Sequence, residues 1–344
     1  MPTPTPHPFP PPIKTMEAKI TERWPSGRLA FEPKWDGFRS LSWSEPEIRL
    51  DSRNERPLLR YFPELEPALR QLPSGTVVDG EIVVVLDGVT QFDTLQQRIH
   101  PAESRITRLS QETPAELVAF DLLAMEGRDL RNEPFEVRRQ ELLALAERLG
   151  DPWHLTPSTT DPDIARGWFQ EYESAGCDGI VAKELDKPYV SGKRAMIKIK
   201  HRRTVDVVVG GFREHKDGGR IGSLLLGLYT ATGDLSFIGH CSGFPDVDRV
   251  AIFERFQQLA ADESFNEGVR VPGAESRWSG GKEMNWTPVA PGVVIEVSYD
   301  QLEGDRFRHA TRFHRWRPDK DARDCTFDQL ERPEGPDFED VVVE

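Results

Sequence analysis

The segment Lys34-Trp35-Asp36-Gly37-Phe38-Arg39 places a primary amine, a carboxylate, a glycine and a guanidinium within six residues. A lysine amine can attack a phosphorus atom and form a covalent lysine–nucleotide bond when neighbouring groups hold the nucleotide. The segment alone is weak, because K-x-D-G occurs by chance in about one chain in ten of this length. A lysine and an aspartate flanking a turn between two strands is the alternative interpretation. Other segments must therefore supply the rest of the chemistry.

Nucleotidyl transfer needs a neutral amine, cations at the α-phosphate, carboxylates for a divalent metal, and a surface for the base. Lys198 and Lys200 are two apart on a predicted strand, so both point to one face and could bind the phosphate. Their charge would also lower the pKa of Lys34, and neutralising a free lysine at pH 7 costs roughly 4–5 kcal/mol. A solvent-facing pair on an edge strand is the alternative.

Two carboxylates are candidate metal ligands. Glu81 lies inside a strongly β-forming run, where an acid seldom stands without a partner. Asp178 immediately precedes another predicted strand. Both could bind Mg²⁺ through oxygen. Turn residues beside glycines are the alternative, and this alternative suits Asp178 better than Glu81.

Two further side chains are candidates for nucleotide contact. Phe120 could stack on a base, although a single phenylalanine in a β run is usually a core residue. Arg53 could reach a phosphate or simply lie in a loop.

Length and composition favour a two-domain protein in a reducing compartment. The chain has 344 residues, too many for one small core. No run of eighteen apolar residues occurs, so no membrane span is predicted. Seven of the first twelve residues are proline, which predicts an extended, disordered lead rather than a signal peptide. Three separated cysteines form no C-x-x-C pair, which excludes a zinc ribbon and favours the cytoplasm.

The net charge of −14 is unevenly distributed. Residues 191–204 contain six basic residues and no acid, and this run could contact a polyanion. A solvated strand face is the alternative interpretation. Residues 324–344 carry eight acids and one arginine, a net charge of −7 and half the total, and we expect this tail to be disordered.

The chain changes character near Thr204. Before it, strands and amphipathic helices alternate; after it, short β runs dominate around one helix. The predicted strands are 31–34, 39–43, 76–86, 116–123, 179–183 and 195–200, then 205–212, 221–230, 235–240, 293–299 and 307–316; the predicted helices are 137–149, about 161–175 and 247–260. Five late strands with a helix are typical of an OB-type barrel, although any small β-barrel fits this inventory.

In order, the segments KWDGFR, SRN, DGE, FDLL, DGIVAK and IKIK resemble the motifs of ATP-dependent DNA ligases, and RHATRFHRWRPDK resembles their last motif. The resemblance covers about residues 12–320 and is greatest to the bacterial two-domain ligase C group. It implies an α+β fold: a nucleotidyltransferase (adenylation) domain with antiparallel sheets and flanking helices, followed by an OB-fold β-barrel domain. The expected boundaries are 1–15 for the flexible lead, 16–204 for adenylation, 205–325 for the OB-fold and 326–344 for the acidic tail.

The resemblance also implies roles at the nucleotide. Lys34 would carry AMP through a phosphoramide bond, and Lys198 and Lys200 would hold the α-phosphate. Glu32 would help to place the adenine, and Phe120 would stack on it.

Further roles follow from the remaining motifs. Glu81 would bind ribose or metal, Asp178 would bind metal, and Lys183 would approach the nucleotide. Arg39 and Arg53 would contact the nucleotide or the nick phosphate. The pyrophosphate of the first step would be oriented by four residues of the last motif: Arg315, Arg317, Asp319 and Lys320. The chain departs from the family pattern at Asp178, where glutamate is usual, and at Met196, where tryptophan is frequent.

The implied activity is the sealing of nicks with 3′-hydroxyl and 5′-phosphate ends in duplex DNA, through a lysine–AMP and then a DNA-adenylate, in DNA repair. ATP and Mg²⁺, or Mn²⁺, would be required. The expected partners are nicked DNA and repair proteins, for a cytoplasmic, nucleoid-associated monomer away from membranes. The second domain would close over ATP and then clamp DNA.

Three alternatives stay open. RNA ligases and messenger-RNA capping guanylyltransferases share the lysine motif and the paired lysines. An NAD-dependent ligase is disfavoured, because the chain lacks that group's cysteine-rich zinc element. A non-catalytic OB-type module would bind nucleic acid without forming a covalent adduct.

Overall fold

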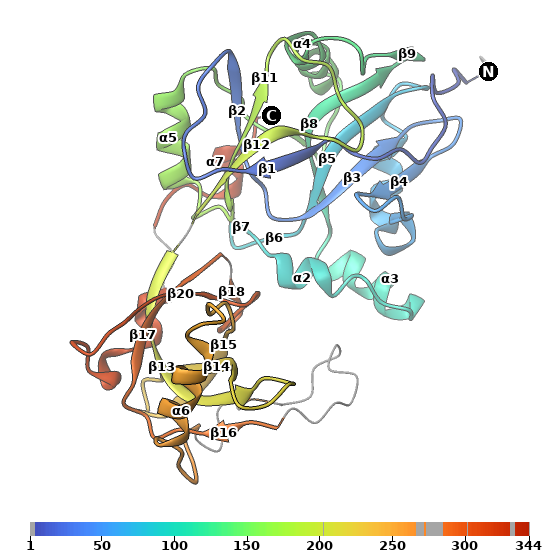
Figure 1. Cartoon of the computed structure of the whole chain (residues 1–344). Coiled ribbons are helices and arrows are strands. Elements are labelled where there is room, and N and C mark those ends of the chain that lie inside the picture. The colour runs from blue at the N-terminus through green and yellow to red at the C-terminus, as the bar shows by residue number, and fades with distance from the viewer. Residues whose placement is uncertain are drawn as a thin grey trace. The chain divides into compact units, whose positions relative to one another are not determined.

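The computed structural model describes residues 4–201, 203–265, 272, 285–300, 302–330 and 334–343. It divides into two compact units (Figure 1), which are described separately: Met1–His201 together with Arg332–Glu344, and Arg202–Glu331. The chain therefore leaves the first unit, forms the second, and returns to the first. Among the described residues, no helix has the length and apolar character needed to cross a membrane.

The first sheet of the first unit carries the lysine segments. Its strand order is β1-β12-β11-β2, and β1 runs parallel to β12 whereas the other pairs are antiparallel. The strands are β1 (Glu17–Ile20), β2 (Leu29–Pro33), β11 (Gly179–Glu184) and β12 (Arg194–Lys200). The predicted strands at 31–34, 179–183 and 195–200 are confirmed within a few residues. Lys34 follows β2 directly, and Lys200 ends β12.

The second sheet of this unit has the order β10-β8-β5-β3-β4, with β9 paired to β8. Its strands are β3 (Phe38–Trp43), β4 (Arg49–Ser52), β5 (Val77–Val83), β8 (Glu116–Met125), β9 (Arg128–Asp129) and β10 (Trp153–Leu155). Gly80 is required by close packing within it, because a Cβ there would lie 2.7 Å from the carbonyl oxygen of Val118. The tight β5–β8 pairing places Glu81 opposite Val118.

The first unit also contains several helices, of which α4 packs against strand β8. The long helix α4 begins at Phe135 and ends at Ala146, close to the predicted 137–149. Helix α5 begins after Asp161, close to the predicted start, and the Asp161 carboxylate caps it by accepting a hydrogen bond from the Asp163 amide at 2.8 Å. The other elements are η1 (Leu59–Tyr61), η2 (Pro63–Leu65), α1 (Glu66–Leu69), β6 (Val85–Leu86), β7 (Val89–Thr90), α2 (Phe92–Gln96), α3 (Glu103–Glu112), α5 (Pro162–Glu171) and α7 (Phe338–Val341).

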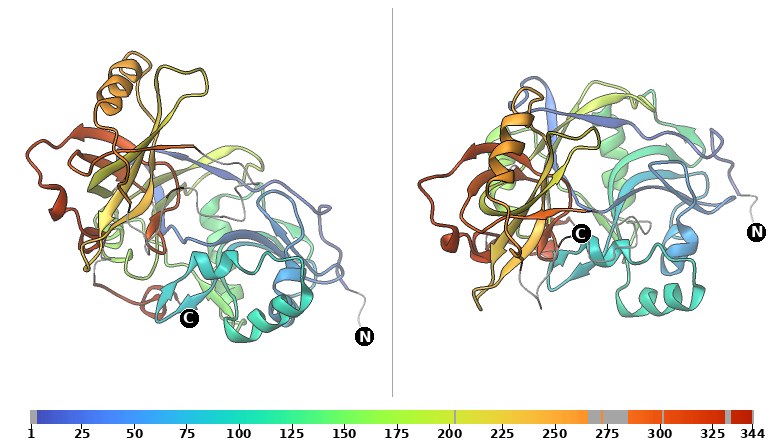
Figure 2. Two further views of the ribbon diagram at one scale, coloured as in Figure 1. Left: turned by 90° about the horizontal axis from the view of Figure 1, so that it is seen from below. Right: turned by 60° about the horizontal axis from the view of Figure 1, so that its bottom comes forward.

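The N-terminal lead differs from the expected disorder. Residues 4–15 run beside the first unit (Figure 2), whereas residues 1–3 lie outside the described part. Phe9 is only 6% exposed and packs edge-on against Trp43, with the Arg131 guanidinium 3.8 Å from the Phe9 ring centroid. One aromatic residue thus anchors a segment whose prolines predicted no structure.

The acidic tail also differs from the expected disorder. Phe338 is fully buried, and Val341 and Val342 are nearly so. Val343 forms an antiparallel bridge with Leu155 of β10. Val341 and Val342 follow Phe338 by three and four residues, so the one turn of α7 brings these three side chains onto the first unit despite the surrounding acids. Residues 331–333 and 344 lie outside the described part.

The second unit is an antiparallel sheet of order β15-β14-β13-β17-β20 with β16 paired to β13, as the five predicted strands and one helix required. Within the described residues this path is open at β15 and β20, so the expected closed barrel is not observed; one bridge joins Cys241 to Thr311. Its elements are β13 (Arg203–Glu214), β14 (Ile221–Tyr229), β15 (Leu235–Cys241), α6 (Arg249–Gln257), β16 (Thr287–Pro288), β17 (Val294–Tyr299), β18 (Leu302–Glu303), β19 (Arg306–Phe307), β20 (Arg312–Trp316), η3 (Ala322–Asp324) and η4 (Phe327–Leu330).

Candidate active site

Lys34 and Asp178 are fixed beside each other by their backbones. The Lys34 amide donates to the Gly179 carbonyl and the Asp178 amide donates to the Lys34 carbonyl, both at 2.8 Å. Gly179 has φ +145°, and a Cβ there would lie 2.0 Å from the Ile199 carbonyl oxygen. Gly37 meets a similar limit, since its Cβ would lie 2.2 Å from the Ile82 carbonyl oxygen. The glycines of both motifs are therefore required by close approach of neighbouring strands.

Asp178 lies between two lysines from different strands. One carboxylate oxygen is 2.8 Å from Lys34 Nζ and the other is 3.0 Å from Lys200 Nζ. The lysine side chains are 22% and 19% exposed, whereas Asp178 is 8% exposed. The structure thus brings together three residues, of which Lys34 is more than 140 positions from the other two in the sequence. Both lysine side chains thus keep part of their surface in contact with solvent.

The charge state of Lys34 differs from the sequence-based expectation. Burial lowers the pKa of Lys34, but the negative charge of Asp178, with smaller effects of Glu81 and Asp36, outweighs burial and raises it. The expected lowering by Lys198 and Lys200 was wrong because it left out the carboxylate between the amines. Burial likewise raises the pKa of Asp178, and Lys34 and Lys200 outweigh that effect and lower it.

The predicted lowering is observed at a different lysine. Burial, followed by the positive charges of Lys34 and Lys200, lowers the pKa of Lys198. Lys198 and Lys200 lie two apart on β12, as predicted. Both face the same side, so the pair presents one amine held by Asp178 and one whose charged form is disfavoured.

Glu81 is the second carboxylate near Lys34. Burial raises its pKa to about 8, against the opposing effects of Lys34 and Arg39. Among the described residues, no group of three or more His, Cys, Asp or Glu side chains is placed to hold a metal ion. Two carboxylates fit Mg²⁺, which commonly completes its shell with water and nucleotide phosphates. Glu81 and Asp178 both act on the charge of Lys34, and a metal role for them stays a prediction.

A second charged group lies further along the same strands. Glu32 is 4% exposed, and its carboxylate is 2.7 Å from the amine of Lys183, which is 3% exposed. Lys183 also donates to the Phe120 carbonyl at 2.7 Å, and its amine lies 4.8 Å from the Phe120 ring centroid. Burial raises the pKa of Glu32 although Lys183 and Arg139 oppose this change. Three predicted nucleotide contacts thus form one group.

Arg39 joins this group through Phe120. Its guanidinium lies 5.2 Å from the Phe120 ring centroid and donates to both oxygens of buried Asp79 at 3.0 and 2.7 Å. The Tyr189 hydroxyl donates to Asp79 at 2.6 Å. Sequence reasoning missed both supports. Asp79 was visible inside the Asp-Gly-Glu segment, whereas nothing in the sequence singled out Tyr189.

Arg53 lies near the Lys34 group, since its charge contributes to the lowered pKa of Lys198, but its own ion-pair partner lies elsewhere. Its side chain is 57% exposed and pairs with Glu17 at 2.9 Å. Arg202 of the basic run lies outside the described residues. A contact of Arg53 with a phosphate stays a prediction.

The last-motif residues belong to the second unit. Arg317 makes two 2.8 Å contacts with Asp206 and one of 2.9 Å with Asp319. Arg315 is 63% exposed and pairs with Glu296 at 2.5 Å. Lys320 follows in the turn after β20, where its amide donates to the Arg317 carbonyl. The pyrophosphate role of these residues stays a prediction.

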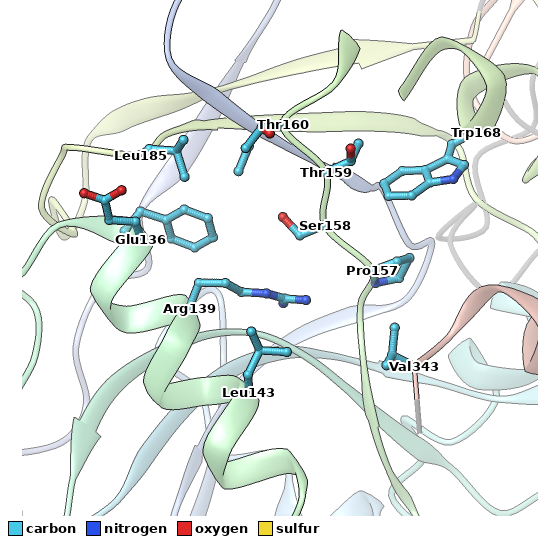
Figure 3. Close-up of a pocket in the computed structure, with 12 residues that line it drawn as sticks. Glu136, Arg139, Leu143, Pro157, Ser158, Thr159, Thr160, Trp168, Leu185 and Val343 are labelled. Atoms are coloured by element: carbon cyan, nitrogen blue, oxygen red, sulfur yellow. The ribbon is translucent and has the colours of Figure 1, made fainter. Parts of the chain in front are cut away.

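A separate cavity of about 550 Å³ lies beside the Glu32 group. Figure 3 shows Arg139 and Leu143 of α4 on one side and Ser158, Thr159 and Trp168 on the other. Arg139 links the cavity to the site, because one guanidinium nitrogen is 3.9 Å from Glu32 and another donates to the Thr156 carbonyl at 2.6 Å. None of the predicted site residues lines this cavity.

Comparison with known families matches both units. The model of the ATP dependent DNA ligase domain covers residues 12–200. The model of the ATP dependent DNA ligase C terminal region covers residues 217–320. The first match spans more than half of the chain and contains Lys34, Asp178 and Lys200.

Curated relatives extend over nearly the whole chain. DNA ligase C2 of Mycolicibacterium smegmatis is 46% identical over 94% of this chain and 95% of the relative. DNA ligase C of Mycobacterium tuberculosis is 45% identical over 97% and 98%. The multifunctional non-homologous end joining protein LigD of Pseudomonas aeruginosa is 35% identical over 93% of this chain but 36% of its own length.

A solved structure supports the fold. A Lig E DNA ligase, described as binding DNA with a minimal scaffold, superposes with a TM-score of 0.57 over 88% of this chain and 99% of its own. At 17% identity this likeness concerns the fold alone. It agrees with an adenylation unit followed by an OB-fold unit.

Proposed function

This chain belongs to the ATP-dependent DNA ligase family, and on that premise we propose that Lys34 is the residue that becomes adenylated. The proposal is supported by one observation above all: Asp178 lies between the amines of Lys34 and Lys200 at 2.8 and 3.0 Å. A nucleophile, a second cation and a carboxylate therefore share one partly accessible group. This is the minimum that attack on an α-phosphate requires.

In the first step the Lys34 amine attacks the α-phosphorus of ATP. A nitrogen–phosphorus bond forms, the bond to the bridging oxygen breaks, and pyrophosphate leaves. Lys34 must first lose one proton to solvent and its contact with Asp178, because the carboxylate holds the ammonium form; a second proton passes from the nitrogen to solvent once the bond to phosphorus has formed. Lys198 and Lys200 would then bind the α-phosphate, whose negative charge replaces that of Asp178 as their partner.

Glu81 and Asp178 would hold Mg²⁺, or Mn²⁺, in this step. When bound, the ion would neutralise phosphate charge and compete with Lys34 for the Asp178 carboxylate. Release of Lys34 from Asp178 would favour the neutral amine. The pKa of about 8 at Glu81 implies that cation binding there is accompanied by proton release.

The Glu32 group would recognise the nucleoside. Phe120 offers a ring face for adenine, and Arg39 is close enough to reach the nucleotide from the same side. Glu32 and Lys183 present an acceptor and a donor within 2.7 Å of each other, which suits the edge of a purine base. Glu81 could also accept a ribose hydroxyl. Arg53, which is exposed on the same unit, would contact a nucleotide or nick phosphate.

The later steps act on DNA. AMP passes to the 5′-phosphate of a nick, and the adjacent 3′-hydroxyl then attacks that phosphate and releases AMP. Arg315, Arg317, Asp319 and Lys320 would act on the pyrophosphate of the first step. Repair is the proposed setting, since a 35% identical relative is named for non-homologous end joining. A cytoplasmic monomer acting with repair proteins is the simplest arrangement.

The test is the lysine–AMP adduct itself. The purified protein is incubated with ATP and Mg²⁺, and its intact mass is measured. We expect the native chain to gain one AMP and Lys34→Ala to gain none, with unchanged thermal unfolding. Lys187→Ala is the matched control, because Lys187 is 57% exposed in the same unit and should leave the adduct intact.

Two results would contradict the proposal. An AMP adduct on the Lys34→Ala variant would place the nucleophile elsewhere. A stable adduct from GTP but not from ATP would indicate capping chemistry instead. Peptide mapping of the adduct identifies the modified lysine in either case.

A further inference from the structure

The C-terminal segment, defined as residues 335–343, is part of the first unit although the second unit precedes it in the sequence. The chain leaves the first unit at His201 and returns at Arg332. The second unit is therefore joined to the first at both of its ends. The C-terminal segment packs on the first unit and so anchors the second of these two connections.

Backbone hydrogen bonds hold this segment at two points, Phe338 and Val343. The Phe338 amide donates to the Gly88 carbonyl at 2.6 Å, and Val343 and Leu155 exchange two hydrogen bonds of 2.9 and 3.2 Å. Asp337 caps the short helix α7 through reciprocal bonds with Asp340. The segment is thus ordered by specific bonds and not by its apolar residues alone.

Phe338 reaches the residue that follows the proposed nucleophile. Its side chain is fully buried, and its ring packs edge-on against two others. The ring centroids lie 5.3 Å apart for Trp35 and 5.1 Å apart for His154. Trp35 is held at a second point, because its indole nitrogen donates to the Thr156 hydroxyl at 2.9 Å. Trp35 and Lys34 are consecutive, so a shift of the indole would move the Lys34 backbone.

Phe338 also packs with neighbours of other site residues. One hydrophobic cluster contains Phe338, Val341 and Val342 together with residues from four site-bearing segments. These residues are Trp35, which follows Lys34; Cys177, which precedes Asp178; Val83, two after Glu81; and Val118, two before Phe120. Among the described residues, the C-terminal segment therefore belongs to a hydrophobic cluster that includes neighbours of Lys34, Asp178, Glu81 and Phe120.

We propose that the C-terminal segment positions Lys34 and Asp178 for nucleotidyl transfer, acting through the contact of Phe338 with Trp35 and through the hydrophobic cluster that both share with Cys177. The proposal rests on the proposed role of Lys34. Its physical basis is the sensitivity of attack to geometry, since a displacement of about 1 Å can lower a rate about 10²-fold. Phe338 touches no reacting atom in this scheme and is a positioning residue.

The test compares two buried truncations in the full-length chain. Phe338→Ala empties the shared cluster, whereas Leu65→Ala empties a different cluster of the same unit. Both leave cavities of similar consequence. At a temperature where both are folded, we expect lysine–AMP formation at saturating ATP to fall about 10²-fold in Phe338→Ala and less than about threefold in Leu65→Ala.

Two further readouts separate positioning from general destabilisation. The ATP concentration for half-maximal rate should change much less than the rate itself in Phe338→Ala, because Glu32 and Lys183 lie outside this cluster. Sealing of a nick that already carries AMP on its 5′-phosphate should change as little, because the Lys34 amine is not a reactant there. Phe338→Leu, which refills most of the cavity, should restore most of the lysine–AMP rate.

Val341→Ala serves if Phe338→Ala does not fold, and we expect the same selective loss of lysine–AMP formation at smaller size. Equal losses in the Leu65→Ala and cluster variants would overturn the proposal, as would a normal rate in both cluster variants. Its failure is distinguishable from failure of the proposed function. In the latter case Lys34→Ala itself would still form the adduct, whatever the cluster variants do.

Discussion

Two buried aspartates of the first unit are paired with cations in contrasting ways. Asp121 is 1% exposed, and Arg138, with no exposed side-chain surface, donates to its two oxygens at 2.7 and 3.0 Å. Asp178 is nearly as buried, but its partners Lys34 and Lys200 are about one-fifth exposed. The first pair is closed to solvent and the second is open. Only the second can exchange a protein partner for a ligand.

The hydrogen bonds around the two aspartates differ in the same way. Arg138 is also bonded to the Glu133 carbonyl at 2.7 Å, and Asp121 accepts from the Leu122 amide at 2.9 Å. Every member of that pair is satisfied, so it fastens helix α4 to strand β8. Around Asp178, by contrast, two lysines have pKa values displaced in opposite directions. The pKa of Lys34 is raised and that of Lys198 is lowered. Displaced values of this kind are typical of reactive sites.

The largest expected effect is on stability, at the closed pair. Arg138→Ala leaves Asp121 charged and buried without its partner, and loss of one member of such a pair costs about 3–5 kcal/mol. We expect a lower free energy of unfolding in urea by that amount. Lysine–AMP formation per folded molecule should stay within about threefold of the native value, because the hydrogen-bond partners of Arg138 are Asp121 and the carbonyls of Glu133 and Lys187, and none of these is assigned a part in that step.

Arg128→Ala is the control for Arg138→Ala. Arg128 pairs with Glu141 on the surface and is 56% exposed, so its loss should not change the unfolding midpoint measurably. Equal destabilisation by the two variants would show that closure of the Asp121 pair has no special energetic value. The comparison with Asp178 would then lose its basis.

The second effect is on activity, at the open pair. Asp178→Asn removes the charge that holds Lys34 and Lys200 and that would bind Mg²⁺. We expect lysine–AMP formation to fall about 10²-fold or more, equivalent to about 2.7 kcal/mol or more in the barrier. Thermal stability should change little, because both lysines can turn to water. Single-turnover formation of the adduct and a melting curve are the two measurements.

Asp178→Glu is the matched variant for this position. It retains the charge and supplies the residue that is usual in the family, so a substantial part of the rate should return. A rate for Asp178→Asn equal to that of the native chain would remove Asp178 from the metal site. Strong destabilisation by the same variant would make Asp178 a structural aspartate like Asp121.

The sequence predicted the parts of the site more completely than their arrangement. Lys34, Asp178 and Lys200 were identified because each lies in a short motif, and strand periodicity placed Lys198 and Lys200 on one face. The salt bridge from Asp178 to two lysines could not be predicted, since it depends on how β2, β11 and β12 pair. That omission explains the incorrect expectation for the pKa of Lys34.

The two chain ends show a different limit. Composition correctly described the lead as proline-rich and the tail as acidic, but composition averages over a segment. Order at each end depends on a few apolar residues: Phe9 against Trp43, and Phe338 against Trp35. Neither partner lies near in sequence, so no local pattern could indicate the contact. The open path of the second sheet likewise depends on pairing that strand counts do not specify.

The smallest expected effect concerns Glu81, which belongs to the open site and is half-buried. Its pKa is about 8 in the folded chain, because burial disfavours the carboxylate, and the ordinary value of 4.5 applies to the unfolded chain. Between these values the folded protein keeps a proton that the unfolded chain has lost. Stability is therefore reduced as pH rises through this window. Glu81→Gln, which cannot ionise, escapes that reduction.

We accordingly expect Glu81→Gln in EDTA to melt higher than the native chain, and by more at pH 8.5 than at pH 6. A difference on the order of 1 kcal/mol corresponds to about 2–4 °C for a unit of this size. Glu17→Gln is the control: the hydrogen bond from Arg53 lowers the pKa of Glu17, so its titration ends below this pH range and its effect should be constant. A pH-independent difference for Glu81→Gln would mean that Glu81 is ionised throughout, paired as fully as Asp121, and the contrast between open and closed carboxylates would not extend to it.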